Sequence, residues 1–186
     1  MAVEKQQDLI DAIVADHRDV AALLDELEAS GDARNRRSLV ERVITELVRH
    51  AVVEEQYLYP AARRALPDGD EMADHQLAGH AAAEQVMKKL SRTDPTTPAF
   101  DDLVGSLAAS VRHHIQDAES DLLPRLRSAC EGVELRELGL KYEQGKKLAP
   151  TRPHPAVPDH PPANKVLGPG VALVDRIRDA LTGRGR

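Results

Sequence analysis

Residues 50–60 read HAVVEEQYLYP and residues 114–124 read HIQDAESDLLP, so a His, a Glu, a Leu and a Pro recur in register. The preceding segments also match, because each has a histidine followed by large apolar residues: His17, Leu23, Leu24 and Leu27 in one, His80, Val86, Met87 and Leu90 in the other. Two similar helical hairpins that pack together form a bundle with pseudo-twofold symmetry. The repeat therefore predicts an all-α fold, a four-helix up-down-up-down bundle.

The apolar residues support four helices. They recur at helical spacing in four stretches, at about residues 8–29, 35–64, 69–90 and 99–129. Asp8 is the expected N-cap of the first helix. Gly31 separates the first two helices, and residues 91–98, with their two prolines, form the loop between the last two. Pro60 and Pro124 are expected to kink their helices.

The composition agrees with a helical, soluble protein. Aromatic residues make up only 2% of the chain, while 41% is hydrophobic and 30% is charged. A net charge of -6 argues against nucleic acid or an anionic membrane as the main partner, because both attract clustered Lys and Arg. The lone Cys130 excludes an internal disulfide. With no signal-like start and no long apolar run, a cytoplasmic location and a small or neutral ligand are expected.

The end of the chain differs from the rest. Seven of the 12 prolines fall between Pro150 and Pro169, a density typical of an extended segment. Apolar residues after Gly170 suggest a short amphipathic terminal helix. We therefore divide the chain into a bundle, residues 1–145, and a proline-rich C-terminal extension, residues 146–186. This extension either wraps the bundle or contacts a protein partner.

Four histidines are the candidate functional residues. His17, His50, His80 and His114 come one from each helix and lie on or beside the core stripe, with carboxylates at Glu54 and Glu119. Burying so many polar groups costs several kcal/mol each unless a cation gathers them. Imidazole and carboxylate ligands suit iron, manganese or zinc, and six of them exceed the needs of one tetrahedral zinc ion. A dinuclear metal site is therefore favoured.

Two assignments near this site have alternatives. Glu55 aligns with Glu119 in the repeat, but Glu54 has the better helical phase with His50, so Glu54 is preferred. Tyr57 and Tyr59 follow the carboxylate and either pack in the core or place a phenol near a bound ligand.

The full set of residues resembles a known family over about residues 8–127. The pattern of His17, His50-xxx-Glu54, His75, His80 and His114-xxxx-Glu119 is similar to the ligand order of the hemerythrin-like (HHE cation-binding) family. The resemblance implies two iron ions, oxo- or hydroxo-bridged, with manganese or zinc as less favoured occupants. It also implies that His17 and His50 cap one iron, that His75, His80 and His114 cap the other, and that Glu54 and Glu119 bridge them.

One departure from the family pattern concerns His75. It lies five residues before His80, whereas the oxygen-carrying hemerythrins have a spacing of four. Five residues rotate an ideal helix by roughly 140°. Gly79 or a π-bulge would be needed to turn both rings inward.

The resemblance implies dioxygen binding or sensing, or turnover of peroxide or nitric oxide, at an open iron position. Whether the protein is an enzyme is left open. A ferritin-like iron oxidase or store is disfavoured, because no histidine has a glutamate three residues before it. A metal-stabilised regulatory or interaction module and a metal-free bundle with polar core histidines are the remaining alternatives.

Overall fold

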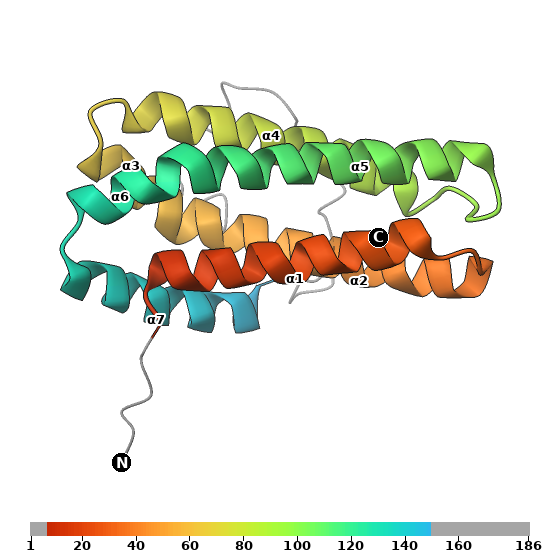
Figure 1. Cartoon of the computed structure of the whole chain (residues 1–186), viewed down its shortest axis with the longest axis horizontal. Helices are drawn as coiled ribbons and strands as arrows, with labels where there is room; N and C mark the ends of the chain where they lie inside the picture. The colour runs from red at the N-terminus through yellow and green to blue at the C-terminus, as the bar shows by residue number, and fades with distance from the viewer. Residues whose placement is uncertain (1–6, 150–186) are drawn as a thin grey trace, which may run out of the picture.

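The computed structural model describes residues 7–149, and every regular element in that range is helical (Figure 1). The elements are α1 (Leu9–Ala29), α2 (Ala33–Val53), the π-helical turn η1 (Glu54–Leu58), α3 (Tyr59–Ala65), α4 (Gly69–Leu90), α5 (Pro98–Asp117), the π-helical turn η2 (Ala118–Leu122), α6 (Leu123–Ala129) and α7 (Gly132–Leu148).

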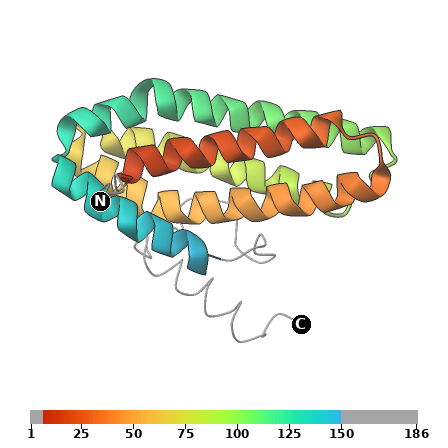
Figure 2. The same cartoon turned by 60° about the horizontal axis from the view of Figure 1, so that its bottom comes forward.

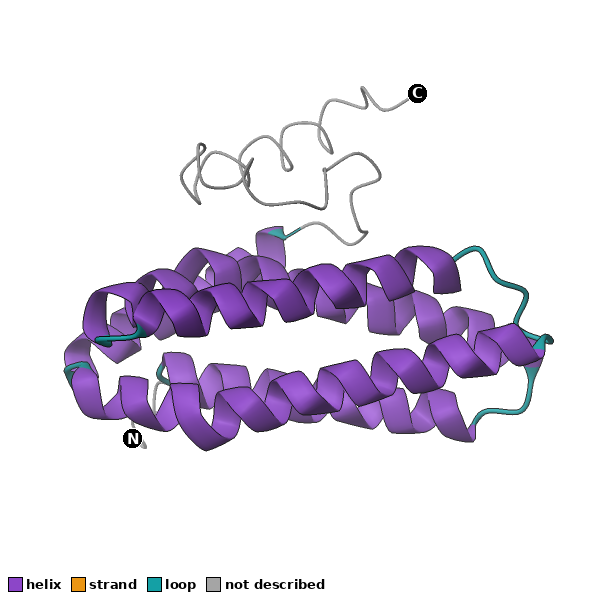
Figure 3. Ribbon diagram, turned by 90° about the horizontal axis from the view of Figure 1, so that it is seen from above, coloured by secondary structure: helices purple, strands orange, loops and turns teal. Residues whose placement is uncertain are grey.

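The first eight elements form four long rods. Because η1 joins α2 to α3 and η2 joins α5 to α6, each of these pairs runs as one continuous rod beside α1 and α4. Figure 3 shows the rods lying side by side, with the connecting loops at the two ends. The predicted all-α, up-down-up-down four-helix bundle is confirmed. The proline-rich segment from Pro150 onward and the expected terminal helix lie outside the described residues.

Helix α7 is a fifth helix that the sequence analysis did not predict. It extends past residue 145, the expected end of the bundle, and packs on one side against α1 and α2 (Figure 2). Its buried residues include Leu135 and Tyr142. A Cβ added to Gly139 would lie 2.7 Å from the backbone oxygen of Gln7, so glycine allows the two backbones to approach closely.

Local signals explain where the helices begin. The Asp8 carboxylate accepts hydrogen bonds from the backbone N–H groups of Ile10 and Asp11, both at 3.0 Å, which confirms the predicted N-cap of α1. Asp32 caps α2 in the same way, by accepting from the backbone of Asn35 at 2.8 Å.

Both rods that contain an internal proline have a π-helical turn immediately before it. The backbone N–H of Tyr59 donates to the carbonyl of Glu54, five residues back, just before Pro60. Leu123 donates to Ala118 in the same way before Pro124. Proline has no N–H and its ring crowds the preceding turn, so a wider turn accommodates it. A π turn thus precedes each of the two prolines at which a kink is predicted.

The apolar core has two main parts, with the candidate site between them. One cluster includes Ile13 and Val53 and extends toward α3, α6 and α7, while the other includes Val20 and Leu47 and extends toward the opposite end. His17 lies between Ile13 and Val20 on α1, so its side chain enters the core at the junction of the two clusters. Within residues 7–149, no helix has the length and apolar character that crossing a bilayer requires.

Candidate metal centre

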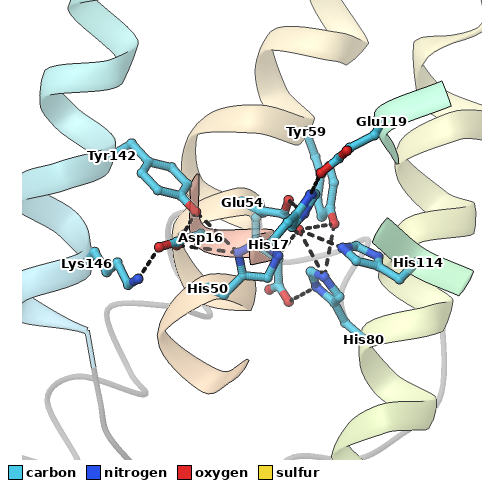
Figure 4. Close-up of polar contacts among 11 residues, drawn as sticks. Asp16, His17, His50, Glu54, Tyr59, His80, His114, Glu119, Tyr142 and Lys146 are labelled. Carbon is cyan, nitrogen blue, oxygen red and sulfur yellow. Dashed lines mark hydrogen bonds and ion pairs between the residues drawn. The ribbon is translucent and has the colours of Figure 1, made fainter. Parts of the chain in front are cut away.

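Four histidines, one from each rod, meet in the middle of the bundle (Figure 4). His17 and His50 have ring centroids 5.0 Å apart, and those of His80 and His114 are 4.9 Å apart. The centroid distances from one pair to the other are longer: 5.9 Å from His17 to His114, and 6.4 Å and 5.8 Å from His50 to His80 and His114. The rings therefore form two pairs, one on α1 and α2 and the other on α4 and α5.

The fully buried side chain of Glu54 lies between these pairs. One of its oxygens, Oε2, lies 3.2–3.3 Å from the Nε2 atoms of three histidines, namely His50, His80 and His114. The other, Oε1, lies 3.8 Å from Nε2 of His17. Burial opposes ionisation, but His50 and His114 hold the pKa of Glu54 well below its usual range. A negative charge thus lies at the centre of four imidazoles.

The chemistry of these side chains fits a metal ion. Four buried atoms at the centre have no hydrogen-bond partner among the described residues: Nε2 of His17, His50 and His114, and Oε1 of Glu54. The same four residues each offer a ligand atom, all within 4.8 Å of one another. A buried polar atom without a partner costs about 1–3 kcal/mol. A cation bound by these nitrogen and oxygen atoms would remove that cost.

Two further carboxylates contact the histidines from outside the centre. Oε1 of Glu119, on η2, lies 2.8 Å from Nδ1 of His17. Oε1 of Glu55 lies 3.4 Å from Nδ1 of His80. Burial lowers the pKa of His80, but hydrogen bonds with Glu54 and Glu55 outweigh it and raise the pKa to about 9. Glu119 thus reaches the centre through His17, while Glu55 orients His80.

Tyr59 also belongs to the centre. Its hydroxyl donates to Oε2 of Glu54 at 2.9 Å and lies 3.1 Å from Nε2 of His80. The π turn η1 separates Glu54 from Tyr59, and its five-residue hydrogen bonding brings both side chains to the same side of the rod. Burial raises the pKa of Tyr59 well above its usual value, so the phenol keeps its proton. Of the two readings for Tyr59, the structure favours the place beside the site.

Sequence reasoning missed two residues next to His50. The Asp16 carboxylate and the Tyr142 hydroxyl lie 3.6 Å and 3.3 Å, respectively, from Nδ1 of His50. Asp16 directly precedes the candidate ligand His17, and only this position in the sequence could have indicated that Asp16 lies at the site. Tyr142 gave no such signal, because it lies on the unpredicted helix α7.

His75 does not join the cluster. Its side chain is 68% exposed, and its Nε2 lies 3.3 Å from Oδ2 of Asp117 on α5. Helix α4 is α-helical from Gly69 to Leu90, without the bulge near Gly79 that would turn both rings inward. The five-residue spacing therefore directs His80 into the core and His75 to the surface. Because the structure does not bring His75 to the other four histidines, we leave it out of the proposed ligand set.

Replacing His75 with alanine is expected to leave metal content unchanged, because its side chain does not contact the four histidines of the centre. Replacing His80 with alanine on the same helix is expected to lower it. Metal analysis of both purified variants beside the original protein checks this. A loss of metal in His75→Ala equal to that in His80→Ala would contradict the geometry.

Comparison with known proteins agrees with the geometry. The sequence profile of the hemerythrin HHE cation-binding domain matches residues 8–126. The fold is similar to the crystal structure of a hemerythrin HHE cation-binding domain-containing protein, the Rv2633c homolog from Mycobacterium kansasii. That similarity has a TM-score of 0.66 at 22% sequence identity, and covers 76% of this chain and 88% of the other.

Two curated proteins are similar in sequence. The uncharacterized hemerythrin-like protein C869.06c of Schizosaccharomyces pombe is 28% identical over 178 residues, which cover 95% of this chain and 88% of that protein. A DNA nickase of Nostoc sp. is 26% identical over 145 residues, which cover 77% of this chain but only 40% of that protein. The family profile matches more than half of the 186 residues of this chain, so the chain belongs to the hemerythrin HHE cation-binding domain family.

Proposed function

We propose that the protein holds two iron ions and binds a small oxidant there: dioxygen, peroxide or nitric oxide. The proposed ligands are His17, His50, Glu54, His80, His114 and Glu119. The pairing of the rings supports two metal positions, since His17 and His50 approach each other as closely as His80 and His114 do. The central carboxylate of Glu54 is within reach of both pairs.

A small cavity beside the histidines carries the proposal for the ligand. Its volume is about 40 Å³. Its wall contains all four histidines and apolar side chains that include Val20, Leu47, Met87 and Val111. Neither Glu54 nor Glu119 lines it, so it lies on the imidazole side of the centre. Measured in the same way, as the volume open to a water-sized sphere, one water molecule needs roughly 10–15 Å³. A diatomic molecule or peroxide therefore fits in the cavity, whereas a larger substrate does not.

The surrounding residues have separate tasks in this proposal. Bound iron would supply the Lewis acidity and redox chemistry that such ligands require. Apolar side chains form part of the cavity wall. Tyr59 donates a hydrogen bond that orients Glu54. Glu55 and Glu119 orient the rings of His80 and His17 through their Nδ1 atoms. To serve as a ligand as well, Glu119 would have to turn toward the metal from its contact with Nδ1 of His17.

Filling the cavity tests this function without removing a proposed ligand. Ala83 lines the cavity on α4, whereas its neighbour Ala82 is exposed. We expect Ala83→Leu to retain iron but to bind nitric oxide or azide at least about 10-fold more weakly, since the larger side chain occupies the space. Iron analysis and spectroscopic titration of the anaerobically loaded protein measure both properties.

Ala82→Leu is the matched control, because it adds the same side chain outside the cavity. It is expected to bind iron and the small ligands like the original protein. Equal ligand affinity in Ala83→Leu and Ala82→Leu would place the ligand elsewhere. A protein that takes up one zinc ion and no iron would refute the di-iron proposal itself.

A further inference from the structure

Helix α7 lies outside the segment that the family profile matches, yet it reaches the metal centre. The match ends at residue 126, and α7 begins at Gly132. Two glycines allow α7 to lie close to the bundle. A Cβ at Gly139 would lie 2.7 Å from the backbone of Gln7, and one at Gly145 would lie 2.8 Å from the ring of Tyr57. Gly139 therefore lets the backbone of α7 pack against the segment that leads into α1, and Gly145 leaves room for the ring of Tyr57.

From this position α7 directs two side chains to one buried carboxylate (Figure 4). The Tyr142 hydroxyl donates to Oδ2 of Asp16 at 2.7 Å, and the Lys146 ammonium group donates to Oδ1. Asp16 is only 6% exposed, so its charge needs such partners. Lys146 also lies 3.3 Å from Glu46 on α2, so it ties α7 to both neighbouring helices.

These contacts favour one of the two tautomers of His50. A phenol has one hydrogen, and Tyr142 gives it to Asp16, so the Tyr142 oxygen acts only as an acceptor toward Nδ1 of His50. Oδ2 of Asp16, 3.6 Å from the same nitrogen, is a second acceptor. Both neighbours therefore favour hydrogen on Nδ1. On the other side of the ring, Nε2 lies 3.3 Å from the carboxylate of Glu54 but makes no hydrogen bond to any described residue, so the neutral ring keeps its lone pair there.

We propose that Asp16, Tyr142 and Lys146 form a clamp, the α7 clamp, which positions His50 for metal binding by holding hydrogen on Nδ1 and freeing Nε2. The inference rests on the function proposed above, because it takes His50 as a metal ligand. A histidine that binds a metal through one nitrogen usually donates the other N–H to a carboxylate, a carbonyl or water. Here the carboxylate is itself held by a helix outside the matched domain.

The double variant Tyr142→Phe with Lys146→Met tests the clamp. It keeps most of the packing and removes the hydroxyl and the charge that hold Asp16. We expect iron affinity to fall about 10- to 100-fold, the usual effect of removing groups that orient a metal ligand. In the metal-free protein, nitrogen-15 NMR is expected to show His50 with hydrogen on Nδ1 originally, and a mixture of both tautomers in the variant.

Lys147→Met is the control, because Lys147 is exposed on the same helix. It is expected to change neither the iron affinity nor the tautomer. Unchanged affinity and tautomer in the double variant would overturn the clamp, and so would an affinity loss without a tautomer change, which indicates general loosening. If the original protein takes up no iron but the tautomer still shifts, Asp16, Tyr142 and Lys146 do hold His50, while the proposed di-iron function fails.

Discussion

Replacing Glu54 with glutamine is expected to weaken iron binding by at least about 100-fold, because groups that merely orient metal ligands already contribute 10- to 100-fold. Glu54 is fully buried, and its two oxygens face all four histidines of the centre. Glutamine has nearly the same shape, but it removes the central negative charge and turns N–H donors toward the metal positions. Iron titration followed by metal analysis measures the effect.

The fold is expected to survive this substitution, which circular dichroism of the metal-free protein can verify. Glu41→Gln is the matched control, since Glu41 is exposed on α2, in the same continuous rod as Glu54. It should bind iron as the original protein does. Iron affinity in Glu54→Gln equal to that of Glu41→Gln would show that Glu54 is not a ligand.

Removing the metal is expected to lower the melting temperature by about 8–16 °C. In the metal-free state, four buried atoms at the centre have no hydrogen-bond partner among the described residues. A ligand present at 1,000 times its dissociation constant adds about 4 kcal/mol to the free energy of unfolding. For a chain of this size, each 1 kcal/mol shifts the melting temperature by about 2–4 °C. Calorimetry of iron-loaded and chelator-treated protein checks the shift.

A variant without two proposed ligands separates this effect from other actions of the chelator. His17→Ala combined with His50→Ala removes the imidazole pair on α1 and α2. Its melting temperature is expected to be the same with and without iron. Identical melting temperatures for the loaded and stripped original protein would contradict a metal held in the core.

Much of the fold could be predicted from the sequence because local signals and core packing agree. The third helix begins at Gly69 and ends at Leu90, as the apolar spacing predicts, and Asp8 caps the first helix. The location of the metal centre could also be predicted, because a histidine recurs at the equivalent core positions of both hairpins. A polar residue at equivalent core positions in both hairpins needs compensation from a buried partner.

The remaining features depend on contacts that are distant in sequence or on small changes in helical geometry. The glycines of α7 lower its intrinsic helix propensity, and their value appears only where its backbone meets Gln7. From the sequence alone Asp16 resembles a solvent-exposed acid, whereas in the structure Tyr142 and Lys146 of α7 cover it. His75 was placed by family spacing, but an uninterrupted α4 turns it outward.

The size of the cavity beside the histidines has a consequence for chemical inhibition. Pockets that hold drug-sized molecules usually measure roughly 300–1,000 Å³, whereas this cavity holds about 40 Å³ and is walled by residues of all four rods. An inhibitor that competes at the centre would therefore have to be as small as azide or cyanide. A selective compound would have to bind at the outer surface, for example where it displaces α7 from α1.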